Sequence, residues 1–170
     1  MRESGDTLAL FPDVEPGRLV APGSTSPRCA PEGGAANLPH EPSVERLTLS
    51  VQQPWAWLLV HGFKPLENRS WPSRFRGVLN IHAGKRIDRE GWDWVRQQFP
   101  EIPIPDQLEV GGVVGTVLQT GCVTTHPSPW FFGPFGHVMT AGEPCALRSC
   151  RGALGYFRAA GPVRRDGRRE

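Results

Sequence analysis

Lysine is almost absent from this sequence. Of the 19 basic residues in the 170-residue chain, only Lys64 and Lys85 are lysines, and all the others are arginines. The bias excludes no class of protein, because genome composition alone can produce it. It does draw attention to the two lysine positions, since lysine carries a compact amine that can lose its proton, whereas arginine keeps its charge on a planar fork.

Long apolar runs are missing as well. No apolar segment approaches the ~18 residues that would predict a membrane span. No apolar h-region follows the first residues, so we expect no signal peptide. These absences predict a cytoplasmic protein with free thiols and no membrane partner.

The sequence also lacks the motifs of several enzyme and metalloprotein classes. It contains no Gly-x-Ser-x-Gly elbow, no P-loop and no dinucleotide fingerprint. Cys122 with His126, and Cys145 with Cys150, could together supply four metal ligands, but neither pair has the close spacing of common zinc sites. We therefore expect no metal and no cofactor.

Composition divides the chain into three parts. The first 46 residues hold seven prolines and none of the six tryptophans, and they lack the large apolar side chains that offset the entropy cost of ordering. We predict a disordered Pro/Gly-rich extension over 1–45, a folded domain over 46–160 and a basic tail over 161–170. The formal charge is −3 over the first 46 residues and +5 over the remainder, which fits a polyanionic partner without requiring one.

Periodicity predicts a strand-rich domain with two short helices early in the chain. Pro54 suits a first helical turn and Gly62 suits the residue after a helix end, while Asp88 is a good N-cap. The expected helices cover 54–61 and 88–99, and the expected strands cover 47–51, 76–83, 111–123 and 152–159. This pattern indicates an α+β fold built on a small β-barrel with flanking short helices, rather than a parallel α/β sheet.

A charged stretch, 62-GFKPLENRSW-71, follows the first predicted helix. On an extended segment Glu67 and Arg69 project to the same face, with Lys64 just before them and the flat ring of Trp71 just after. Arginine or lysine can bind phosphate, glutamate can accept from a base or a ribose, and tryptophan can stack on a base. The same residues also fit an ordinary surface ion-pair cluster of little energetic weight.

Further polar and aromatic residues lie close to this stretch in sequence. His82, Lys85 and Arg86 lie on or just after the second predicted strand. If that strand pairs with the charged stretch, these side chains converge with Lys64, Glu67 and Arg69. Tryptophans near the same elements could add stacking surface: Trp55, Trp57, Trp71 and Trp130.

The sequence resembles a known family, the ASCH domain (activating signal cointegrator-1 homology domain). The resemblance begins in 49-LSVQQPWAWLLVHGFKPLENRSW-71. The family hallmark Gly-x-Lys-x-x-Glu-x-Arg is filled by Gly62, Lys64, Glu67 and Arg69. The segments 76–86, 130–138 and 152–157 are similar to later strands of the family, so that the resemblance covers about residues 47–158.

This resemblance implies a PUA-like fold, a small β-barrel with a cleft bordered by helices. It also implies RNA binding, which in some members of the superfamily is directed to modified bases. Some small relatives are enzymes, among them a branch that hydrolyses N4-acetylcytidine and a reported ribonuclease. The N4-acetylcytidine branch has threonine where this chain has Glu67, so the resemblance does not extend to that activity.

The leading hypothesis is a nucleic-acid-binding module, with RNA as the expected ligand. In this hypothesis Lys64, Arg69, Lys85 and Arg86 contact phosphate, and Glu67 orients Lys64 and Arg69. Trp71 and Trp130 stack on bases, with Trp55 and His82 bordering the site.

Two alternatives remain open. One is an enzyme acting on RNA or a modified nucleoside, with Lys64 as an activated amine or general base, Glu67 tuning it and His82 as its acid–base partner. The other is a protein-interaction domain that meets its partner through the aromatic loop around Trp130.

Overall fold

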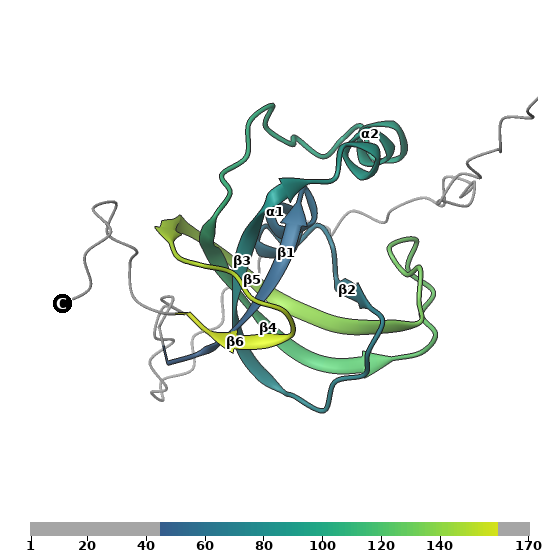
Figure 1. Cartoon of the computed structure of the whole chain (residues 1–170). Helices are drawn as coiled ribbons and strands as arrows, with labels where there is room; N and C mark the ends of the chain where they lie inside the picture. The colour runs from purple at the N-terminus through teal and green to yellow at the C-terminus, as the bar shows by residue number, and fades with distance from the viewer. Residues whose placement is uncertain (1–44, 160–170) are drawn as a thin grey trace, which may run out of the picture. The chain divides into compact units, whose positions relative to one another are not determined.

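The computed structural model describes residues 45–159. The predictions made for the N-terminal extension and the basic tail therefore concern residues outside the described range, apart from Glu45. One mixed sheet and two short helices make up the described part (Figure 1). The strands are β1 (Leu47–Gln53), β2 (Leu66–Arg69), β3 (Gly77–Ile87), β4 (Gly112–Val123), β5 (Phe135–Ser149) and β6 (Tyr156–Arg158), and the helices are α1 (Trp55–Val60) and α2 (Arg89–Gln98).

The six strands follow the order β2-β5-β4-β3-β1-β6. The β1–β3 pair is parallel, and the other described pairs are antiparallel. The α+β class is thus confirmed. No helix among residues 45–159 is long and apolar enough to cross a membrane.

The predicted closed barrel is wrong, because the sheet stays open between β2 and β6, its two end strands. Side chains bridge this opening instead of a backbone ladder. Arg69 on β2 donates to the carbonyl oxygen of Ser50 on β1 at 2.5 Å, and the ring of Trp71 packs edge-on against Tyr156 on β6. We call this opening the seam.

Helix α1 anchors the core because it is apolar on every side that meets the sheet. It packs against all strands from β1 to β5, and Figure 1 shows it lying against β1. Ala56, Leu58, Leu59 and Val60 are all buried, and burying each of the larger ones stabilises the fold by about 1.5–3 kcal/mol. Gly115 on β4 allows the close approach, because a Cβ there would lie 2.8 Å from Val60 Cγ1.

Local signals at the helix ends are confirmed. Pro54 is the N-cap of α1, and Gly62, with φ of +76°, turns the chain away after it. Asp88 caps α2 by accepting from the Gly91 amide at 2.9 Å, and its second oxygen accepts from Trp55 Nε1 at 2.9 Å.

Strand pairing differs from the expectation in two ways. The pairing of the second strand with the charged stretch, which was a condition for the side chains to converge, does not occur, since β3 pairs with β1 and β4 while β2 pairs with β5. Strand β5 also continues to Ser149 through a Gly142-x-Pro144 segment, over which the periodicity predicted no strand. Register shifts against β4 accommodate that irregular stretch, so the sheet keeps a strand that local sequence argues against.

Candidate functional site

The charged stretch folds into a buried chain of ion pairs. Lys64 Nζ lies 2.9 Å from Glu67 Oε2, and Arg69 Nη2 lies 3.2 Å from Glu67 Oε1. Lys64 Nζ also donates to the carbonyl oxygen of Leu66 at 2.6 Å. The side chains of Lys64, Glu67 and Arg69 are 3%, 10% and 20% exposed, so Arg69 is the member of the three that reaches the surface.

The turn after α1 places Lys64 in this position. The amides of Phe63 and Lys64 both donate to the carbonyl oxygen of Leu58, at 2.9 and 3.2 Å. This fixes the backbone of Lys64 against the helix end, and its ammonium lies 5.6 Å from the ring centroid of Trp55. Lys64 is thus enclosed by protein, with 3% of its side chain exposed, and its contact with phosphate stays a prediction.

Burial and charge oppose each other along this chain of ion pairs. Burial raises the pKa of Glu67, but the nearby Lys64 and Arg69 outweigh it and hold the pKa below its ordinary value. Burial also lowers the pKa of Lys64, and the attraction of Glu67 offsets only part of that effect. Glu67 is consequently the charged centre on which both cations depend.

Arg69 connects these ion pairs to β1 and, through β1, to His82. The Ser50 residue whose carbonyl accepts from Arg69 also places its Oγ 3.1 Å from His82 Nδ1. His82 Nε2 lies 3.3 Å from the carbonyl oxygen of Cys150. Because a carbonyl can only accept, Nε2 carries the proton and Nδ1 accepts from the Ser50 hydroxyl. His82 thus reaches the signature residues through Ser50, and not through pairing of β3 with β2.

His82 is held in its neutral form. Burial lowers its pKa below the ordinary 6.5, and the hydrogen bond to Cys150 offsets only part of that effect. His82 is only 3% exposed. The reason is that both faces of β3 are covered, one by the core and the other by the segment after β5.

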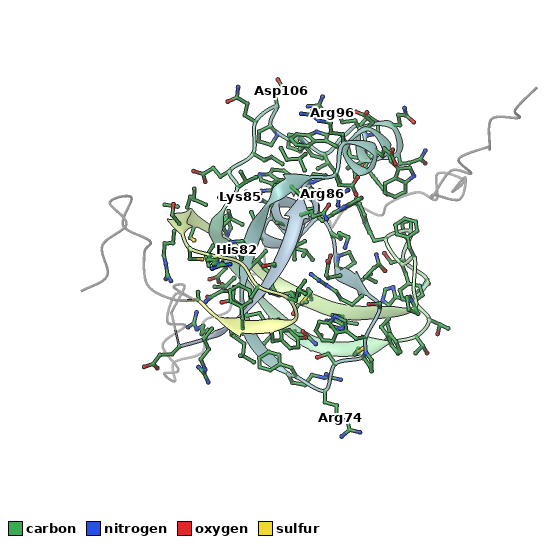
Figure 2. The ribbon with its side chains drawn as sticks, viewed as in Figure 1. Arg74, His82, Lys85, Arg86, Arg96 and Asp106 are labelled. Atoms are coloured by element: carbon green, nitrogen blue, oxygen red, sulfur yellow. The ribbon has the colours of Figure 1, made fainter. Side chains whose placement is uncertain are left out.

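Two hollows adjoin at the segment 150–155. The first, of about 930 Å³, is lined by Ser50, His82, Lys85, Arg151 and neighbouring residues, and we call it the β3 pocket. The second, of about 790 Å³, is lined by Asn68, Arg69, Ser70, Trp71, Leu154, Gly155 and Tyr156, and we call it the seam pocket. Leu154 is 99% exposed and borders both. Figure 2 shows His82 and Lys85 following each other along β3, with Arg86 at its end and Arg74 far from them.

A polar network that the sequence analysis did not find lies beneath the seam pocket. The Tyr156 hydroxyl donates to Gln119 Oε1 at 2.6 Å, and it lies 2.8 Å from Ser73 Oγ and 3.2 Å from His137 Nδ1. His137 Nε2 lies 3.1 Å from the carbonyl oxygen of Trp71. This network fixes the ring of Trp71, which packs edge-on against both His137 and Tyr156.

The predicted stacking residues separate into two groups. Trp71 lines the seam pocket. Trp130 is only 3% exposed and stacks on Phe99 with centroids 4.4 Å apart. Trp55 packs edge-on against Trp130 at 6.4 Å. Trp55 and Trp130 therefore belong to an aromatic cluster that joins α1 to α2, and packing accounts for them.

Ser50 and Arg151 are site residues that sequence reasoning missed. Ser50 lies between Leu49 and Val51, which are both buried in the core, so it occupies the opposite face of the strand. Asking what that face carries would have found it. No local signal marks Arg151. Among residues 45–159, no group of three or more His, Cys, Asp or Glu side chains could hold a metal ion.

Fold and site together define a small α+β domain whose open sheet is held by a buried Lys–Glu–Arg chain beside two surface hollows. Comparison with known proteins shows which family this domain resembles. A model of the ASCH domain matches residues 49–130. This match confirms the resemblance to the ASCH domain that the Gly-x-Lys-x-x-Glu-x-Arg stretch predicts. The family is broadly regarded as RNA-binding.

Two curated relatives share part of this region. The chain is 34% identical over 82 residues to activating signal cointegrator 1 from Mus musculus. It is 33% identical over 82 residues to activating signal cointegrator 1 from Homo sapiens. Each alignment covers 45% of this chain and 14% of the relative, so the likeness concerns one domain of much longer proteins.

Proposed function

We propose that the protein binds single-stranded RNA across the seam pocket and the β3 pocket. The observation that carries the proposal is the meeting of the two hollows at Leu154, with aromatic rings lining one and cationic side chains lining the other. Each volume falls within the ~300–1,000 Å³ typical of small-ligand sites. A nucleotide base in the seam pocket and its flanking phosphate in the β3 pocket would use both surfaces.

Cations of the β3 pocket supply the phosphate contacts. Lys85 and Arg151 line it, and Arg86 follows Lys85 at the end of β3. All three are exposed, and none of them forms an ion pair with another residue of the described range. Their charge is thus open to the backbone of a nucleic acid, which gives affinity without sequence preference.

The seam pocket supplies the base contact. Trp71 offers a ring whose orientation His137 and Tyr156 already fix, which reduces the entropy cost of stacking. Arg69 lines the same pocket, and Glu67 holds its guanidinium from below. This role for Glu67 is the orienting one that the sequence predicted, and it leaves an edge of Arg69 for a phosphate or a base.

An enzyme that uses Lys64 as its general base fits this geometry less well. Lys64 Nζ donates to both Leu66 and Glu67 and is enclosed. A substrate could meet this amine only after both hydrogen bonds and the surrounding packing had opened.

Fluorescence anisotropy with a labelled ten-nucleotide RNA, titrated with the full chain at several salt concentrations, tests the proposal. Trp71→Ala should lose about 1–3 kcal/mol of binding, the range for one stacked base. Lys85→Ala combined with Arg151→Ala should weaken binding and flatten the slope of log K against log salt by about 1.4, at ~0.7 for each lost phosphate contact.

Arg74→Ala is the matched control. Arg74 is an exposed arginine that lines neither pocket and lies far from His82 and Lys85 in Figure 2, so Arg74→Ala removes one positive charge outside the proposed site. If Arg74→Ala weakens binding as much per lost charge as Lys85→Ala combined with Arg151→Ala does, only net charge matters. Affinity that does not change with salt would overturn the proposed phosphate contacts.

A further inference from the structure

We propose that Ser50 and His82 form a nucleophile–base pair that hydrolyses a carboxylic ester bearing an anionic group. The inference goes beyond RNA binding, since it concerns a covalent step in the β3 pocket. It starts from the hydrogen bond between Ser50 Oγ and His82 Nδ1, at 3.1 Å. A serine hydroxyl directed at the free nitrogen of a neutral imidazole is the arrangement that activates serine.

Backbone pairing holds the two side chains together. Ser50 and His82 are direct partners in the parallel register of β1 with β3, so they project on the same side of the sheet. Two further contacts fix them from behind. Arg69 donates to the carbonyl of Ser50 at 2.5 Å, and His82 Nε2 is held by the carbonyl of Cys150 at 3.3 Å. The pair thus sits on rigid strands rather than on a loop.

The second contact sets the tautomer that the chemistry requires. With its proton on Nε2, His82 presents the lone pair of Nδ1 to the serine hydroxyl. The Cys150 carbonyl accepts the Nε2 proton in the way that a third group orients the base of a catalytic triad. In the serine proteases Nε2 faces the serine and Nδ1 carries the proton toward the aspartate. Here Nδ1 faces the serine and Nε2 carries the proton toward the carbonyl, so the two nitrogens have exchanged roles while the order of the three groups is the same.

The pocket around the pair selects the substrate. Lys85 and Arg151 line the same hollow as Ser50 and His82. These two cations favour a substrate that carries a carboxylate or a phosphate, and they stabilise the negative charge that develops on the ester carbonyl oxygen. Gly152 packs over the pair so closely that a Cβ there would lie 2.8 Å from Ser50 Oγ and 2.6 Å from His82 Cε1. Only glycine leaves room at the hydroxyl.

The reaction balances with water as its one co-reactant. Ser50 Oγ attacks the ester carbonyl carbon while its proton passes to His82 Nδ1. The bond from that carbon to the alcohol oxygen breaks, and the alcohol leaves with the proton from Nδ1. Water then attacks the acyl-serine and gives a proton to Nδ1. That proton returns to Ser50 Oγ as the carboxylic acid departs.

A fluorophosphonate probe tests the nucleophile on the full-length chain. We expect one adduct in the intact mass, mapped to Ser50 by peptide sequencing of the wild-type protein. Ser50→Ala should remove the adduct. Ser149→Ala should keep it, because Ser149 lines the same pocket but hydrogen-bonds to no histidine among residues 45–159. In His82→Gln, with folding checked by circular dichroism, labelling should slow by about 100-fold or more, the usual share of a general base.

Ester turnover tests the substrate class. We expect faster hydrolysis of mono-4-nitrophenyl succinate than of 4-nitrophenyl acetate, and loss of that preference in Lys85→Ala. No adduct on the folded wild-type chain, an adduct on another residue, or unchanged labelling in His82→Gln would each overturn the proposal. Because these readouts contain no RNA, they separate this inference from the RNA-binding proposal.

Discussion

Glu67→Gln is the change that tests most directly whether the family signature works as a buried ion-pair chain. Glu67 faces Lys64 Nζ at 2.9 Å and Arg69 Nη2 at 3.2 Å. The amide keeps the shape of the carboxylate but leaves Lys64, 3% exposed, without a counter-charge. Removing one partner of a buried pair costs about 3–5 kcal/mol, whereas an exposed pair is worth about 0–1 kcal/mol.

The comparison with Lys64→Met sharpens the test. Methionine keeps the unbranched stem and removes the charge, and Glu67 still has Arg69 as its partner. We expect a smaller loss than in Glu67→Gln. In the double variant no buried cation is stranded at position 64, so its loss should be less than the sum of the two single losses by about 0.5–3 kcal/mol.

The dependence on pH gives an independent readout. Burial already lowers the pKa of Lys64, and loss of Glu67 removes the group that opposes this effect. At pH values between the lowered pKa of Lys64 in the folded variant and the ordinary 10.5, Lys64 therefore binds a proton in the unfolded chain more than in the folded one. The free energy of unfolding of the variant should rise with pH in that window.

Urea unfolding of the full chain, followed by tryptophan fluorescence at pH 7 and pH 9, measures both effects. Circular dichroism before unfolding checks that each variant starts folded. If Glu67→Gln lowers the free energy of unfolding by less than about 1 kcal/mol, the ion pair contributes no more than an exposed surface pair does. An equal deficit at the two pH values would contradict the assignment of the cost to a stranded lysine.

Three further predictions concern the fold. The free energy of unfolding should decline as pH falls below 6.5. Burial lowers the pKa of His82 and of His137, so below that pH the unfolded chain takes up protons that the folded chain does not bind. His137→Gln should make the decline shallower in urea titrations. Trp130→Ala should cost about 3–5 kcal/mol, as for a core aromatic, measured as a shift in the urea midpoint. Asp88→Ala removes both the cap of α2 and the acceptor of Trp55, and thermal unfolding should report a loss of about 1–2 kcal/mol.

The parts of the fold that the sequence could predict are those decided by neighbouring residues. Pro54, Gly62 and Asp88 mark helix ends because each acts within one turn of its own position. The signature stretch also acts locally, since Lys64 and Glu67 meet across three residues. These features follow from backbone geometry and short-range hydrogen bonds.

Strand partners could not be predicted in this way. Alternation along 76–83 shows which side chains share a face, but it does not show which strand lies alongside. The pairing of β2 with β5, at the edge of the sheet, depends on where α1 and the long β4–β5 hairpin leave space. The contacts of Ser50 and Tyr156 could not be predicted for the same reason, because their partners His82 and Gln119 are 32 and 37 residues away in the sequence.

The side-chain closure of the seam has a thermodynamic consequence. One guanidinium, that of Arg69, both lines the seam pocket and holds the carbonyl of Ser50. An anion that approached the exposed edge of Arg69 would draw the guanidinium toward itself and strain its hydrogen bond to that carbonyl. Occupancy of one pocket is therefore coupled to the geometry of the other, and by reciprocity a ligand that tightens Ser50 must alter affinity at the seam by the same factor.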